Sequence, residues 1–277
     1  SNTLFHLRME LIKRIATGTM LAVFFLSPNQ GQGQEADFNN EAIWASGTFR
    51  TDYVWGIRSM ADGKHYTTQD YDENEGSCIV KWSYKTGKVV DTLLTSNMAF
   101  GDAREIFGGY EFSSDERFVV LTTASEGLYR HSFYANFFVY DFESDEDARS
   151  ITDFSLGKQR LAQLSPAGDK VAFVRENNIF ISDLATGAEI QVTTDGVTNA
   201  IINGATDWVY EEEFGDDQGL FWNGDGSRLA YLKFDESNVR EFHMPVYGSL
   251  YPDPYTFKYP KAGEDNSEVS VHIYTLA

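Results

Sequence analysis

The stretch SPAGDKVAFVRENNIFISDLATGAEIQVT, Ser165 to Thr193, decides the fold class of this chain. Gly168 ends a first turn, Asn177-Asn178 suits the positive-φ positions of a tight hairpin, and Thr186-Gly187 turns the chain again. The segments between these turns are short, apolar and rich in β-branched residues, as in strands. The predicted strands are Val171–Arg175, Ile179–Asp183 and Glu189–Val192. Three antiparallel strands in about thirty residues are most of a β-propeller blade.

The same unit recurs along the chain. A polar turn followed by a strand is found again in SMADGKHYTT from Ser59, SSDERFVVLTT from Ser113 and NGDGSRLAYLKF from Asn223. With Gly63, Glu116, Gly168 and Gly226 as equivalent points, the units are 53, 52 and 58 residues apart. A repeat of this kind predicts an all-β fold, a partial β-propeller of about four blades, each a four-stranded antiparallel sheet.

Two insertions interrupt the repeat. One lies between the third and fourth units and holds INGATDWVYEEEF; the other, Glu236 to Ser267, carries four of the six prolines. Long loops on a rigid β-scaffold are where binding residues are usually found, so we expect the functional site there.

The first 33 residues do not resemble the repeats. Lys13 and Arg14 precede the apolar run Ile15–Leu26, and a small polar stretch follows it, which is the order of a secretory signal peptide. We therefore predict residues 1–33 as a signal peptide or N-terminal extension and residues 34–277 as the propeller. The apolar run is too short to span a bilayer comfortably, so we expect no membrane span in the mature chain. The order of a signal peptide predicts a periplasmic or secreted location. The alternative to a signal peptide is that these N-terminal residues are an artefactual extension.

Composition and motifs restrict the function classes. A formal charge of −20 argues against a nucleic-acid partner, because phosphate backbones are bound by excess Lys and Arg. The single cysteine, Cys78, excludes an internal disulfide and any multi-cysteine metal site. The five histidines are scattered, and no metal motif, phosphate-binding Gly-rich loop or G-x-S-x-G element is present. We expect no metal, no other cofactor and no catalytic residue in this chain.

The run DWVYEEEF, Asp207 to Phe214, has three interpretations. It can be the solvated face of an acidic chain. It can be a glycosidase pair, although adjacent residues rarely place two carboxylates about 5 to 9.5 Å apart across a sugar. It can also be a clamp for a protonated α-amine, whose three donors two carboxylates can share. Such a clamp needs a nearby cation when empty, because like charges held close raise one another's pKa.

These residues, taken together, match a known pattern. DWVYEEEF is preceded by YRHSF (Tyr129–Phe133) and followed by YPKAG (Tyr259–Gly263), and between them lies a W-x-x-x-G-x-x-L-A-Y strand, Trp222–Tyr231. GIRSMADGKHYT, from Gly56, matches the start of the repeats. This combination resembles the dipeptidyl peptidase IV family, in particular its bacterial secreted members. The resemblance covers the chain from about Glu41 to Ala277 in order.

The resemblance implies an eight-bladed propeller joined to an α/β-hydrolase domain in a homodimeric serine exopeptidase, which removes Xaa-Pro or Xaa-Ala dipeptides from peptides with a free N-terminus. It assigns the substrate amine to Glu212 and Glu213 and the carbonyl between the first two substrate residues to Arg130, and leaves Glu211 a structural role. It also implies that the Ser-Asp-His triad lies beyond Ala277, so that this segment recognises the amine, gates access and cannot hydrolyse alone. The alternative is a non-catalytic periplasmic β-propeller that serves as a binding or scaffold module.

Overall fold

The computed structural model describes residues 38–51, 54, 56–103 and 105–276, and the chain divides into two compact units, residues 1–53 and 54–277. In the first unit the described residues form one short π-helix, η1 (Glu41–Ala45). The predicted signal peptide, residues 1–33, lies outside the described residues. No helix among the residues that the structure describes is long and apolar enough to cross a membrane.

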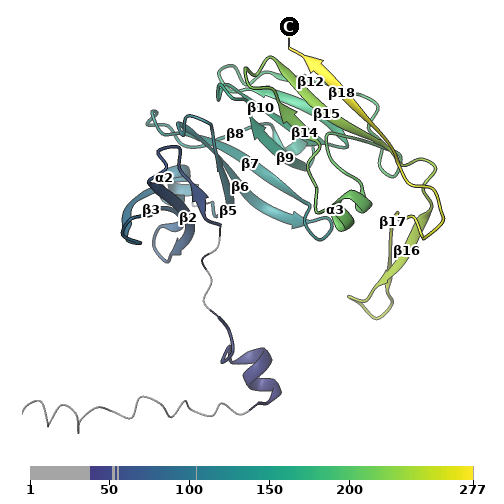
Figure 1. The fold of residues 1–277 in the computed structure, drawn as a ribbon, viewed down its shortest axis with the longest axis horizontal. Coiled ribbons are helices and arrows are strands. Elements are labelled where there is room, and N and C mark those ends of the chain that lie inside the picture. The colour runs from purple at the N-terminus through teal and green to yellow at the C-terminus, as the bar shows by residue number, and fades with distance from the viewer. Residues whose placement is uncertain (1–37, 52–53, 55, 104, 277) are drawn as a thin grey trace, which may run out of the picture. The chain divides into compact units, whose positions relative to one another are not determined.

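The second unit consists of successive antiparallel sheets (Figure 1). The first sheet contains β1 (Arg58–Ser59), β2 (His65–Asp72), β3 (Gly76–Ser83) and β4 (Val89–Thr95), paired in chain order. Two short helical segments follow, α2 (Ser96–Phe100) and η2 (Gly101–Ala103). The next group of strands is β5 (Phe107–Phe112), β6 (Phe118–Gly127), β7 (Phe133–Asp141) and β8 (Arg149–Ser150).

The third group begins with the short helix η3 (Phe154–Leu156) and contains β9 (Gln159–Leu164), β10 (Lys170–Arg175), β11 (Asn178–Asp183) and β12 (Glu189–Gln191). One pair, Ala135 with Gln159, joins it to the second group. The fourth sheet contains β13 (Ile201–Asn203), β14 (Leu220–Trp222), β15 (Arg228–Asp235) and β18 (Glu268–Thr275). The all-β, partial-propeller prediction with about four blades is confirmed.

Apolar side chains fill the spaces between consecutive sheets. Ile79 and Leu94 of the first sheet pack with Phe107 and Leu121 of the second group. Equivalent clusters join the second group to the third and the third to the fourth sheet. Because each sheet buries a face against the next, each repeat depends on its neighbours for stability, as in other repeat architectures.

The four turns that define the repeat have the same hydrogen bonds. In each, the N–H of the first residue bonds to the carbonyl five residues later, and the N–H of the fourth residue bonds back to the carbonyl of the first. The turns start at Met60, Ser113, Ser165 and Asn223. Their fourth residues, Gly63, Glu116, Gly168 and Gly226, all have φ between 62° and 70°. Glu116 therefore adopts a left-handed conformation that its three counterparts reach as glycines.

The turn between β10 and β11, in the third repeat, lies one residue earlier in the chain than predicted. Glu176 and Asn177, with φ of 50° and 58°, form the turn, not Asn177-Asn178. The reason is that Asn178 is buried and its side chain is used: its Oδ1 accepts from Gly196 N at 2.8 Å and from Thr193 Oγ1 at 3.2 Å. Asn178 thus belongs to strand β11.

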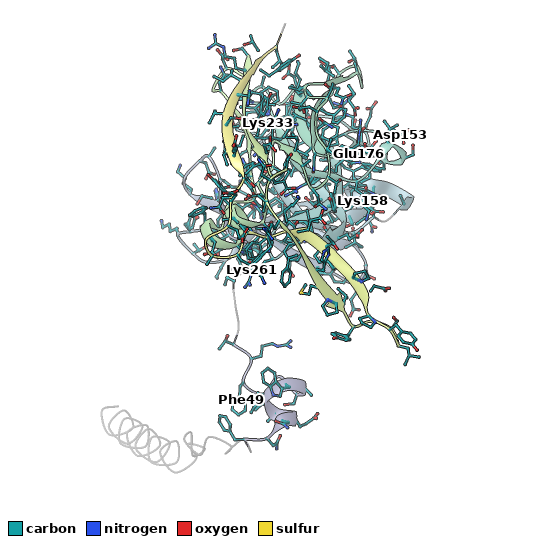
Figure 2. The ribbon with its side chains drawn as sticks, turned by 90° about the vertical axis from the view of Figure 1, so that its right-hand side faces the viewer. Phe49, Asp153, Lys158, Glu176, Lys233 and Lys261 are labelled. Atoms are coloured by element: carbon teal, nitrogen blue, oxygen red, sulfur yellow. The ribbon has the colours of Figure 1, made fainter. Side chains whose placement is uncertain are left out.

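The second insertion was predicted as a long loop, but it contains a β-hairpin. Strands β16 (Glu241–Val246) and β17 (Asp253–Lys258) pair only with each other among the described strands, and Pro245 lies opposite Pro254. Proline is tolerated there because no further strand needs its missing N–H. We call β16, β17 and residues 247–252 the arm. Figure 2 shows its two strands with their side chains running out from the other sheets.

Glu116 allows a test of the turn assignment. Glu116→Gly and Glu116→Ala both remove the bond from Ala61 N to Glu116 Oε1, but only Gly relieves the left-handed backbone. We expect the Gly variant to be more stable than the Ala variant by about 1 kcal/mol in urea unfolding. At the neighbouring Asp115, the same pair of substitutions should give the opposite order. Equal stabilities at position 116 would contradict the assignment.

Candidate functional site

The glutamate run forms a short helix, α3 (Trp208–Phe214), which the sequence analysis did not predict. Asp207 caps its N-terminus, with the side chain accepting from Tyr210 N at 3.0 Å. Gly215, at φ 68°, ends it in the left-handed conformation. Asp before and Gly after a seven-residue run is a helix signature that could have been noticed, but the aromatic and β-branched residues of the run favour strands.

The helical geometry gives three adjacent carboxylates three different environments. Successive residues of a helix point about 100° apart, since one turn takes about 3.6 residues. Glu211 is fully buried, Glu212 is half-buried and Glu213 is exposed. The run is therefore not a uniformly solvated face.

Glu211 joins α3 to the YRHSF segment. Its carboxylate accepts from His131 N at 2.6 Å, from Ser132 N at 2.8 Å and from Ser132 Oγ at 2.6 Å. A buried carboxylate with three donors is well satisfied and restrains both chain segments. These contacts are those expected of the structural role that the sequence analysis gave to Glu211.

The structure brings two of the three predicted site residues into contact. Arg130, in the connection between β6 and β7, donates from Nε to Glu212 Oε2 at 2.7 Å. The Glu212 side chain is 13% exposed and that of Arg130 is 72% exposed. The exposure of Arg130 keeps this ion pair weak, about 1 kcal/mol or less. Glu213 is the next residue of α3 and is exposed, and its carboxylate forms no hydrogen bond or ion pair with another described residue.

The base of the arm and Tyr259, the residue directly after it, pack against both segments of this site, the YRHSF segment and α3. Phe257 lies 6.1 Å from the ring of Tyr129 and 6.2 Å from that of Trp208, between ring centroids. Tyr259 contacts Trp208 edge-on at 4.6 Å, and Tyr255 OH donates to Leu128 O at 3.4 Å. The sequence analysis recognised Tyr259 only as part of YPKAG and missed this aromatic support, because nothing in the spacing of the two segments shows that they meet.

Two further carboxyl groups are buried at the start of α3, those of Asp207 and Glu236. Asp207 Oδ2 accepts from Ser267 Oγ at 2.6 Å, which ties the cap to the chain after the arm. Glu236 is buried nearby, and its pKa is raised to about 7 by burial and by the repulsion of Asp207, against the attraction of Lys258. Glu236 therefore changes its charge near neutral pH.

Removal of the Glu211 carboxylate should destabilise the protein. Glu211→Ala leaves three donors without their acceptor in a buried site, and we expect a loss of about 3–5 kcal/mol in urea unfolding. Glu211→Gln keeps an acceptor for the two backbone N–H groups and can donate to Ser132 Oγ, so it should lose less than half as much. Glu212→Ala is the matched control and should change stability by less than about 1 kcal/mol. A similarly small effect of Glu211→Ala would refute the anchoring role.

Glu236 should make stability depend on pH. Below its ordinary pKa of 4.5 the group is neutral in both states, and between 4.5 and about 7 only the unfolded state ionises, so stability falls as pH rises. Above about 7 the full penalty, up to about 3 kcal/mol, is present. Glu236→Gln should remove this decline in urea unfolding measured from pH 5 to pH 8.

Asp235→Asn provides the control, because hydrogen bonds to Ser237 lower the pKa of Asp235. That variant removes a neighbouring carboxylate and should keep the decline. A Glu236→Gln protein with the same pH dependence as the original chain would contradict the assignment.

Known proteins resemble this chain in sequence and in fold. The family model described as the dipeptidyl peptidase IV (DPP IV) N-terminal region matches residues 113–277, which include the Arg130 segment, α3 and the arm. The crystal structure of Porphyromonas gingivalis dipeptidyl peptidase 4 superposes with a TM-score of 0.78 at 43% identity, over 87% of this chain and 34% of that one.

Two curated relatives extend the comparison. Prolyl endopeptidase FAP of Homo sapiens is 32% identical over 82% of this chain and 29% of its own length. Probable dipeptidyl-aminopeptidase B of Podospora anserina is 35% identical over 60% of this chain and 19% of its own. The chain thus spans less than a third of the length of these relatives. A family model that matches more than half of the sequence, together with a propeller that superposes on a solved relative, shows that the chain belongs to the dipeptidyl peptidase IV family, within its N-terminal propeller region.

Proposed function

We propose that this chain is the N-terminal propeller segment of a serine exopeptidase that removes Xaa-Pro or Xaa-Ala dipeptides from peptide N-termini. In this proposal the segment binds the free α-amine of the substrate and gates access to a hydrolase domain, which supplies the Ser-Asp-His triad. The observation that carries it is the contact between Arg130 and Glu212 beside a helix anchored by the buried Glu211.

The proposed binding step exchanges one cation for another. A protonated α-amine has three donors, and Glu212 and Glu213 supply carboxylate acceptors for them. Arg130 neutralises Glu212 while the site is empty and then becomes available to the first peptide carbonyl. Because the Arg130 side chain is largely exposed, it can move at little energetic cost.

Such a clamp sets the length of the product. Two extended residues span about 6.6–7.2 Å, so fixing the amine determines which peptide bond reaches a serine beyond it. Binding energy at the propeller would thereby select dipeptides without any contact to the bond that is cleaved.

Location and assembly are further parts of the proposal. Residues 1–33 have the order of a signal peptide, which supports a secreted or periplasmic protein. The full-length protein is proposed to be a homodimer. Large side chains exposed at the tip of the arm support this, namely Tyr247, Leu250 and Tyr251.

Peptide binding to the 277-residue chain tests the proposal. We expect Ala-Pro-Gly-amide to bind and its N-acetylated form to bind at least tenfold more weakly in isothermal titration calorimetry, because acetylation removes the charge. Glu212→Gln and Glu213→Gln should each weaken binding of the free amine about tenfold or more, as expected for an ammonium left without its partner.

Glu264→Gln is the matched control, since Glu264 forms an exposed pair with Arg240 at 2.9 Å elsewhere in the chain. That variant should bind like the original protein. Equal binding of the acetylated and free peptides would overturn the clamp. A full-length gene product that binds the peptide without releasing a Gly-Pro chromogenic group would favour the alternative, a non-catalytic propeller binding module.

A further inference from the structure

A cavity of about 400 Å³ adjoins the clamp. It is lined by residues of β5 and β9, by the start of β7 and by the residues before β14. Ser132 is one of the lining residues, and its hydroxyl donates to Glu211, so the cavity lies directly beside the anchor of α3. Arg130 is only two residues from Ser132, a span of about 7 Å at most.

Arg160 lines this cavity and has unused hydrogen-bond donors. Arg160 is 4% exposed, and its Nε and Nη2 atoms have no hydrogen-bond partner among the described residues. Buried guanidinium groups are normally paired, because donors without an acceptor destabilise the protein. Arg160 is therefore a buried cation whose strongest hydrogen-bonding face is unoccupied.

The same chain shows what these two nitrogens bind. In Arg117, Nε and Nη2 donate to the two carboxylate oxygens of Asp141 at 3.0 and 2.8 Å. This side-on arrangement is the bidentate geometry that arginine forms with carboxylates. The donors unused in Arg160 are the same pair, so a carboxylate is the group that would satisfy both of them.

The other charged groups of the cavity do not occupy Arg160. Arg58 also lines it, stacks on the Tyr110 ring at 4.1 Å and attracts the carboxylate of Glu111. Asp217 lines the cavity as well, but no ion pair joins it to Arg160 among the described residues. The carboxylates of Glu211 and Asp217 attract the Arg160 guanidinium, but neither forms a hydrogen bond or ion pair with it among the described residues, so its Nε and Nη2 remain available for an incoming anion.

We propose that Arg160 forms a subsite for an acidic side chain on the first residue of the peptide held at the clamp. The proposal rests on the proposed amine-binding function and specifies a substrate class, peptides that begin with Asp or Glu. Because Nε and Nη2 are buried, the guanidinium rotates into the cavity that it lines as the carboxylate enters. In this arrangement the carboxylates of α3 hold the amine of the first residue and Arg160 holds its acidic side chain.

A pair of peptides of equal size tests the subsite on the 277-residue chain. Asp-Pro-Gly-amide and Asn-Pro-Gly-amide differ in one charge, and their amidated ends carry no competing carboxylate. We expect the Asp peptide to bind at least tenfold more tightly in isothermal titration calorimetry at pH 7.5, and Arg160→Met to abolish the preference. Arg117→Met, which removes an arginine already paired with Asp141, should keep it.

The unaltered chain alone can overturn the proposal, so the result does not depend on the folding of the Arg160 variant. Equal binding of the two peptides, or tighter binding of the Asn peptide, would refute the proposed subsite. N-acetyl-Asn-Pro-Gly-amide separates this from failure of the clamp. If acetylation weakens binding while Asp and Asn are equivalent, the clamp stands and only the subsite is wrong. If acetylation has no effect, the clamp itself fails.

Discussion

The carboxylate of Glu211 is the constraint on which the site depends. It accepts three hydrogen bonds from His131 and Ser132 while lying on the same helix as Glu212 and Glu213. Arg130 lies in the connection between β6 and β7 and Glu212 in helix α3, 82 residues apart in the chain. A surface ion pair between them is too weak to hold two loops together. The buried carboxylate provides that restraint, and the exposed pair can then open and close without loss of structure.

The repeat made most of the fold predictable from the sequence. Turn chemistry fixes local geometry, and four similar turns at similar spacing leave few folds other than a propeller. Even Glu116, which lacks the glycine of its counterparts, was placed correctly because its neighbours in the turn match. The hairpin turn at Asn177-Asn178 was misplaced by one residue because both asparagines tolerate positive φ. Only the buried bonds of Asn178 to Thr193 and Gly196 decide between the two registers.

The insertions were less predictable, because neither follows the repeat. Asp207 and Gly215 mark a helix, but the residues between them favour strands, and tertiary contacts decided the outcome. Only the family resemblance implied that Glu212 and Arg130 lie near each other, because it assigns both to one substrate, and no local pattern relates residues so distant in sequence. The aromatic contacts between Trp208 and the base of the arm were not expected at all. Such contacts depend on how the insertions fold back onto the sheets.

In the fourth sheet two short strands, β13 and β14, pair with successive parts of one edge of β15. This arrangement has a consequence for how the site between them can change. Strand β18 pairs with the whole of β15, and β13 and β14 share the other edge of β15, each in regular antiparallel register. The chain leaves the sheet after β13, forms α3, and returns as β14 to the same partner strand. Helix α3 is therefore an insertion between two strands whose positions are fixed by pairing with β15. The exposed residues of this segment can be exchanged while Glu211 keeps its buried bonds and the sheet beneath keeps its pairing, which makes this position suitable for grafting a new recognition surface onto the propeller.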